Sequence, residues 1–283
     1  MSKRGVVVSC PFEYADRSLH IISSELDPVE LRRWVLYWDT IDWPVNNLIH
    51  IESRDSEVRL LMDEGVLERT SVRVTGSGDL AMGFLGAQIT AFRNRAAEDP
   101  GAWTMSQPGS QLILPEGEDA KGPIAELDLL RVLPTPMPDT SIDSILEFKR
   151  KREEELLELR GALDKLYLAI LDSRDTERAA VSAKHEVERG VRQLDRVLSE
   201  SQISRFMSSV KVEFDLAKLV GGLTVGGATG TVFGVPLAIG AATGAVVSAL
   251  SLKVTAGPRL SGLPDSVRAF AYLGHAKKDL GAR

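Results

Sequence analysis

The stretch DPVELRRWVLYW at residues 27–38 predicts an amphipathic helix and sets the pattern for the amino-terminal half of the chain. Asp27 has the side chain of an N-cap, and Pro28 has the fixed φ angle that suits the first helical turn. Apolar residues then recur at the spacing of a single helix face: Leu31, Trp34, Val35 and Trp38. We therefore expect a helix that begins at Pro28, buries this face and ends before Pro44.

Segments typical of strands and of further helices flank this helix on both sides. A buried strand is expected at residues 5–9, and further strands are expected at 48–51, 66–74, 103–115 and 124–133. Helices are expected at 79–98 and at 54–65, the latter ended by a left-handed cap at Gly65. In the helix at 54–65 the residues expected to face inward are Leu60, Leu61 and Met62. This order predicts an α+β fold, with a mixed α/β domain over residues 1–134.

Composition and charge exclude some classes of partner. The net charge of -6 argues against nucleic acid, because binding phosphates requires clustered lysine and arginine. The single cysteine, Cys10, allows no internal disulfide, which favours a reducing, cytoplasmic compartment. Cys10 follows an apolar run and is expected to be a small buried hydrophobe at a strand end, rather than a nucleophile.

A charged helical stretch follows the proline-rich boundary at 134–138. We expect an antiparallel helical hairpin over residues 135–209, with its turn at 172–175. One helix-pairing seam consists of Leu156, Leu159, Leu163, Leu166 and Ile170, and a second consists of Val187, Val191, Leu194 and Leu198. The hairpin either packs on the chain's own sheet or pairs with a protein partner or second copy through residues 143–208. The basic run at 149–152 is followed by glutamates and predicts a solvated helix face.

The carboxy-terminal part, residues 210–283, contains a segment without a single charged residue from Leu219 to Leu252. Glycines recur in it at every fourth position, which on a helix leaves a groove where a second helix can approach closely. They are Gly222, Gly226, Gly230 and Gly234, followed after Pro236 by Gly240 and Gly244. A helical hairpin is therefore predicted. It is either a buried element packed on the first domain or a hairpin that enters a bilayer, although each arm is shorter than the roughly 20 residues of a spanning helix.

No motif for catalysis, nucleotide binding or metal binding is found in the sequence. The glycine-rich run lacks the Lys-Ser/Thr pair that reaches phosphate and Mg²⁺, and no paired His or Cys ligands occur at metal-binding spacing. We therefore expect no cofactor and no metal. Asp39 and Asp42, beside Trp38 and Trp43, are the one candidate for an enzyme site. Their alternative role is structural, as polar residues near buried tryptophans.

Four passages resemble an uncharacterised bacterial family, a domain of unknown function. They are LYWD at 36–39, PMP at 136–138 together with ILEFKR at 145–150, the alternating residues that lead into the glycine-rich run, and FAYL at 270–273. The resemblance implies a bacterial cytoplasmic protein. It supplies no catalytic residues.

Three classes of function follow from these patterns. The favoured one is a non-catalytic cytoplasmic interaction or scaffold protein that associates through the charged hairpin. The alternative is a membrane-permeabilising effector, acting at the inner membrane and in phage defence, that inserts the glycine-rich hairpin. The third is an enzyme with a site near Asp39 and Asp42.

Overall fold

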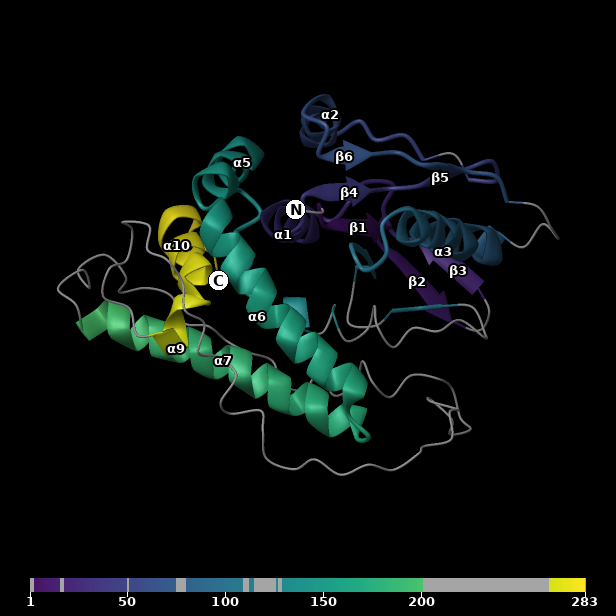
Figure 1. The fold of residues 1–283 in the computed structure, drawn as a ribbon. Coiled ribbons are helices and arrows are strands. Elements are labelled where there is room, and N and C mark those ends of the chain that lie inside the picture. Colours follow the sequence, from purple (N-terminus) through teal and green to yellow (C-terminus); the bar gives the residue numbers. More distant parts are fainter. Residues whose placement is uncertain are drawn as a thin grey trace.

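The structure is a computed structural model and describes residues 3–15, 18–49, 51–74, 80–108, 112–114, 126, 129–200 and 265–282. Figure 1 shows a sheet with flanking helices next to a pair of long helices, with the carboxy-terminal helices packed beside that pair. The α+β fold class predicted from the sequence is confirmed.

The main sheet has four short parallel strands in the order β6-β4-β1-β8. They are β1 (Gly5–Val8), β4 (Thr40–Asp42), β6 (Leu67–Glu68) and β8 (Trp103–Ser106). The helices α1 (Pro28–Tyr37), α2 (Ser56–Asp63) and α3 (Leu80–Glu98) connect them in sequence. Numbered along the chain, the strands therefore lie in the order 3-2-1-4, which is half of a doubly wound α/β sheet.

Two smaller ladders extend from this sheet. Strands β2 (Phe12–Ala15) and β3 (Ser18–Ile21) form an antiparallel pair directly after β1, and β5 (Val45–Asn46) pairs in parallel with β7 (Ser71–Val72). The expectation of one mixed sheet was therefore wrong for the described residues, because the antiparallel pair lies outside the parallel sheet.

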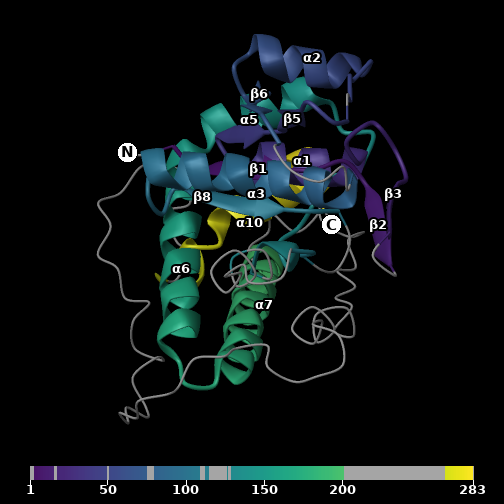
Figure 2. The same cartoon turned by 90° about the vertical axis from the view of Figure 1, so that its right-hand side faces the viewer.

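The two faces of the sheet are covered by different helices, as Figure 2 shows with α3 in front of the strands and α1 behind them. Val6 and Val8 of β1 belong to a large buried cluster with α1, whereas Val7 belongs to a smaller cluster with α3. This division follows from the geometry of a strand, in which successive side chains point to opposite faces.

The helical half consists of α5 (Ile142–Lys151), α6 (Glu153–Asp172), α7 (Thr176–Glu200), α9 (Asp265–Arg268) and α10 (Ala271–Leu280). Helices α6 and α7 pack on each other, and α10 contacts α5, α6 and α7. Apolar residues of these helices share one buried cluster with β1 and α1. The hairpin predicted at 135–209 is therefore packed against the amino-terminal half.

Several local predictions are confirmed. Asp27 caps α1 by accepting hydrogen bonds from the backbone N–H groups of Val29 and Glu30, both at 2.9 Å. Gly65 has a φ of 67° at the end of α2, a left-handed conformation that favours glycine. The turn predicted at 172–175 lies between α6 and α7.

Other local predictions were wrong. The described residues of the strand predicted at 48–51, which are Leu48, Ile49 and Ile51, are not in a strand. The Asn46 side chain accepts hydrogen bonds from the backbone N–H groups of Leu48 and Ile49 and holds a turn. The strand expected at 66–74 is divided into β6 and β7, which pair with different strands. Met62 was expected to face inward but is 45% exposed.

The two strands predicted after α3 also differ from the structure. Strand β8 ends at Ser106, and Gln107 then exchanges side-chain hydrogen bonds with the backbone of Ile113. Part of the predicted strand at 124–133 is helical, at residues 129–131. In both places, an apolar run was taken for a strand, although a short apolar run does not by itself distinguish a strand from other buried segments.

The basic run at 149–152 does not form a solvated face. Only 12% of the Lys149 side chain and 12% of the Arg152 side chain are exposed, although Arg150 is 70% exposed. Arg152 has a non-helical conformation, with φ of -120° and ψ of 29°, where α5 ends and α6 begins. This break turns part of the run toward the rest of the fold. The six glycines of the predicted zipper hairpin, from Gly222 to Gly244, lie outside the described residues.

Candidate functional site

The candidate site lies where the order of the parallel strands reverses. The chain leaves β1 toward α1 on one face of the sheet, and it reaches β8 through α3 on the opposite face. At such a switch point the two loops after the adjacent strands separate and leave a crevice, which is the usual ligand site of open α/β sheets. Here Ser9 follows β1 and Gln107 follows β8.

Buried polar side chains cluster at this edge of the sheet: Ser9, Gln88, Ser106 and Gln107. Gln88 projects from α3, and its side-chain nitrogen donates to the carbonyl oxygens of Val7 at 3.1 Å and Ser106 at 2.9 Å. The Gln107 side chain donates in turn to Gln88 Oε1 at 2.8 Å. Gln88 therefore bridges β1 and β8 at the switch point, and its orientation is fixed on both sides.

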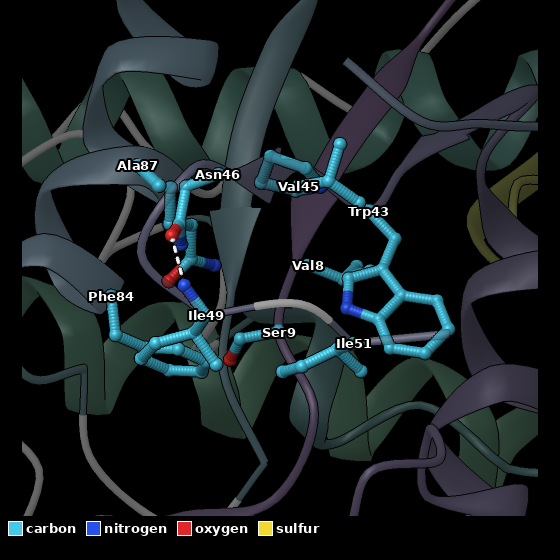
Figure 3. A pocket seen from close by; sticks show the side chains of 11 residues that line it. Val8, Ser9, Trp43, Val45, Asn46, Ile49, Ile51, Phe84 and Ala87 are labelled. Atoms are coloured by element: carbon cyan, nitrogen blue, oxygen red, sulfur yellow. Dashed lines mark hydrogen bonds between the residues drawn. The ribbon is translucent and has the colours of Figure 1, made fainter. Parts of the chain in front are cut away.

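A cavity lies beside this cluster, between α3 and the carboxyl ends of β1 and β4 (Figure 3). It contains about 330 Å³ of free space, which includes its open mouth. Its described lining residues are Val8, Ser9, Trp43, Pro44, Val45, Asn46, Ile49, Ile51, Phe84, Ala87 and Gln88. None of them is charged, and three have polar side chains.

The Ser9 hydroxyl is the unsatisfied group of this cavity. Its oxygen is buried and has no hydrogen-bond partner among the described residues. By contrast, the Ser106 hydroxyl accepts a hydrogen bond of 3.0 Å from the indole N–H of Trp34. A buried hydroxyl left without any partner costs roughly 1–3 kcal/mol, so the Ser9 hydroxyl needs a partner from a molecule that enters the cavity.

We therefore expect opposite effects when each serine is replaced by alanine. Ser9→Ala removes an unpaired hydroxyl and should leave the free energy of unfolding unchanged or raise it by up to about 1 kcal/mol. Ser106→Ala leaves the buried Trp34 N–H unpaired and should lower the free energy of unfolding by about 1–3 kcal/mol. Urea unfolding of wild type and of the two variants measures both changes in this free energy. Equal destabilisation would show that Ser9 has a structural partner.

Trp43 forms a wall of the cavity and also carries a cationic neighbour. The guanidinium of Arg69 lies 3.9 Å from the centroid of the Trp43 ring, and its Nη2 donates to the carbonyl oxygen of Ile51 at 2.7 Å. Nearby, burial raises the pKa of the Cys10 thiol to about 11. The thiol is therefore protonated at neutral pH, in line with its predicted role as a buried hydrophobe.

The family model described as "Family of unknown function (DUF6236)" matches residues 10–281. The chain belongs to this family. The resemblance to a domain of unknown function is thereby confirmed, whereas bacterial origin stays a prediction. No curated protein and no solved structure matches the chain. The site of this DUF6236 chain must therefore be interpreted from its own residues.

The phosphate position of a dinucleotide-binding fold is blocked in this DUF6236 chain. In such folds the pyrophosphate sits at the N-terminus of the first helix, where free backbone N–H groups point at it. Here the carboxylate of Asp27 accepts hydrogen bonds from two of those groups, and Glu30 adds a second negative charge in the first turn. An anion at this helix end would be repelled by both carboxylates.

Asp39 and Asp42, the two carboxylates singled out from the sequence, share no hydrogen-bond partner in the structure. Asp39 accepts two hydrogen bonds from Arg160, at 2.8 and 3.0 Å, whereas Asp42 accepts one of 2.8 Å from Arg95 and another from Thr70. Each is thus neutralised by its own arginine, and Trp38 and Trp43 beside them are buried. The structure does not bring these residues together as one site.

A second polar centre connects the sheet to the helical hairpin at the amino-terminal ends of the strands. Asp39, just before β4, contacts Arg160 of α6 and lies 3.9 Å from Lys149 of α5. Arg4, just before β1, pairs with Asp164 of α6. Burial lowers the pKa of Lys149 to about 8, even though the neighbouring Asp39 charge acts in the opposite direction. These contacts hold the hairpin in place on the sheet.

The residues predicted to pair helices lie inside this DUF6236 fold. Leu156, Leu159, Leu163 and Ile170 are buried, Leu166 packs on the same cluster, and Val187 and Val191 of α7 belong to it as well. Association with a partner through the hairpin would therefore have to use other side chains than those of this seam.

No described helix has the length and hydropathy needed to cross a membrane. The described residues also contain no group of three or more His, Cys, Asp or Glu side chains arranged for a metal.

Sequence reasoning missed the polar cluster at the switch point. Ser9 and Gln107 carried a usable signal, since each is a polar residue directly after a buried run that ends a strand. Gln88 carried no such signal. A single glutamine within a helix is an ordinary residue, and its role becomes visible only when its hydrogen-bond partners on two strands are known.

Proposed function

We propose that this protein binds a small molecule at the carboxyl edge of its parallel sheet, with an uncharged, largely apolar part of the ligand in the cavity. The observation that carries the proposal is the buried Ser9 hydroxyl, which lines the cavity at the switch point and has no hydrogen-bond partner in the part of the chain that the structure describes. An unsatisfied polar group that is retained at the usual ligand position of the fold is explained by a ligand that completes its hydrogen bond. The proposal concerns binding and assigns no reaction.

The lining supports this ligand class. Eight of the eleven described lining residues are apolar, and Gln88 already uses its side chain to bridge the strands. Ser9 is therefore the group that recognises a hydrogen-bonding partner, while the apolar walls favour a small branched or flat hydrocarbon group. The carboxylate-capped N-terminus of α1 argues against phosphates at their usual position.

The test uses isobutyramide, a small uncharged amide with a branched apolar group, and measures its binding by saturation-transfer NMR. Wild type should bind the probe, and Ala87→Leu should abolish the signal because its larger side chain fills the cavity that Ala87 lines. Ala97→Leu, the same substitution at an exposed position of the same helix, should bind like wild type. Equal signals from both variants would contradict the proposal.

Self-association through the charged hairpin is the second candidate function, with the protein acting as a cytoplasmic scaffold. The observation that favours it is a set of exposed apolar residues near the α6–α7 turn: Leu168 at 60%, Leu171 at 39% and Val181 at 38%. Apolar side chains gathered on a surface often mark an interface.

The membrane-effector proposal rests on Gly222 to Gly244, which lie outside the described residues. Liposome flotation of the purified protein is its test.

A further inference from the structure

Arg69 is placed at the same edge of the sheet as the cavity and contacts its walls. It follows β6 directly, just as Ser9 follows β1. It stacks on the ring of Trp43 and donates to the carbonyl oxygen of Ile51, and both of these residues line the cavity. The guanidinium thus contacts two residues that line the cavity, and Arg69 itself is not a lining residue.

The positive charge of Arg69 has no direct ion pair with any described carboxylate. Its Nε is buried and has no hydrogen-bond partner among the described residues. Burial lowers the pKa of Arg69, while the charges of Asp42 and Glu25 act in the opposite direction. Both of those carboxylates already have other partners. Asp42 accepts hydrogen bonds from the side chains of Arg95 and Thr70. Glu25 accepts hydrogen bonds from the Ser53 hydroxyl and from the backbone N–H of Arg54.

The thiol of Cys10 does not supply the missing charge either. Burial raises its pKa to about 11, so it is neutral at physiological pH. A half-buried guanidinium with a buried, unsatisfied donor is costly unless an anion pairs with it directly, because a desolvated charge needs a partner. A guanidinium over an aromatic ring keeps the donors at its edge for hydrogen bonds, and one of those of Arg69, Nη2, already donates to Ile51.

We propose that Arg69 binds a carboxylate of the ligand, so that the ligand is a small monocarboxylic acid whose apolar part occupies the cavity. This inference rests on the proposed function and adds the charged half of the ligand to it. A planar carboxylate matches the edge of a guanidinium. A monoanion is also favoured over a phosphate dianion, since the apolar surroundings make removal of each additional charge from water more costly.

The experiment compares isobutyrate with isobutyramide, its uncharged isostere, by NMR titration at constant ionic strength. Wild type should bind isobutyrate about tenfold or more tightly than the amide, because a hydrogen bond to a charged partner is stronger than a neutral one. Arg69→Met should lower isobutyrate affinity about ten- to a hundredfold and leave isobutyramide affinity unchanged. Arg59→Met removes the same charge from an exposed position of α2 and should change neither.

The outcomes separate this inference from the proposed function. Equal isobutyrate affinity in wild type and Arg69→Met overturns the role of Arg69, while amide binding that Ala87→Leu abolishes still supports the cavity. Tighter binding of inorganic phosphate than of isobutyrate overturns the carboxylate assignment. Failure of wild type to bind either isostere overturns both proposals. Arg69→Gln, which keeps a planar neutral donor over Trp43, replaces Arg69→Met if the latter fails to fold.

Discussion

Arg160→Met is expected to lower the free energy of unfolding by about 3–5 kcal/mol, the largest loss among single substitutions at the polar contacts of this fold. Arg160 is only 8% exposed. It donates two hydrogen bonds to Asp39 and one of 2.6 Å to the carbonyl oxygen of Tyr37. Methionine preserves the volume but leaves the Asp39 carboxylate without its arginine and the Tyr37 carbonyl without this donor.

The free energy of unfolding that Arg160→Met loses should depend on pH in a defined direction. Burial alone would raise the pKa of Asp39, but the hydrogen bonds and charge of Arg160 outweigh it and hold that pKa below its ordinary value. The stabilisation is therefore present above the unfolded-state pKa of about 4 and is lost as the pH falls through the lower folded-state value. The difference between wild type and Arg160→Met should narrow on acidification.

Unfolding of wild type and of Arg160→Met in guanidinium chloride, at neutral and at acidic pH, measures the loss of stability and its dependence on pH. Arg150→Met is the matched control, since Arg150 is 70% exposed and lies 3.8 Å from Glu64 at the surface. It should change the free energy of unfolding by less than about 1 kcal/mol. A loss below about 1 kcal/mol for Arg160→Met would show that the contact between Arg160 and Asp39 does not hold the hairpin on the sheet.

Gly190→Leu is expected to destabilise the fold at or above the upper end of the roughly 1–3 kcal/mol range for overpacked cores. A Cβ at Gly190 of α7 would lie 2.3 Å from a ring carbon of Phe270. Phe270, which directly precedes α10, is only 1% exposed, so displacing its ring would disturb the buried contacts around it. The added side chain would push the carboxy-terminal helices away from α7.

Gly161→Leu gives the matched comparison on the partner helix. A Cβ at Gly161 of α6 meets nothing within 4 Å, so replacing this glycine should stabilise the fold by about 0.5–1 kcal/mol through helix propensity. Thermal unfolding of the two variants should therefore shift Tm in opposite directions. Parallel shifts of both would contradict the tight contact between α7 and Phe270.

Features that depend on local sequence were predictable, and features that depend on distant partners were not. Helix α1, its Asp27 cap and the glycine at 65 follow from residues within one turn of each other. The switch point required the order of four strands, which hydrophobic patterns do not specify. Lys149 and Arg152 of the basic run at 149–152 were misread as solvated, because they lie near Asp39 and Asp279, which are distant from them in the sequence.

The candidate site shows the same division. Cys10 was correctly expected to be buried, because it continues an apolar run. The importance of Arg69 was not visible in the sequence, where it is one of 34 lysine and arginine residues. What distinguishes it is the absence of a nearby free carboxylate, and that depends on where Asp42 and Glu25 find their own partners.

The contact between Tyr272 of α10 and α1 has a consequence for synthesis on the ribosome. The Tyr272 hydroxyl donates to the carbonyl oxygen of Leu36 at 2.9 Å, across a sequence separation of 236 residues. At a translation rate of about 5–20 residues per second, roughly 10–50 seconds pass between the synthesis of α1 and the synthesis of Tyr272. During that interval the apolar surface of α1 that α10 later covers remains open to solvent, which makes the nascent chain a substrate for holdase chaperones.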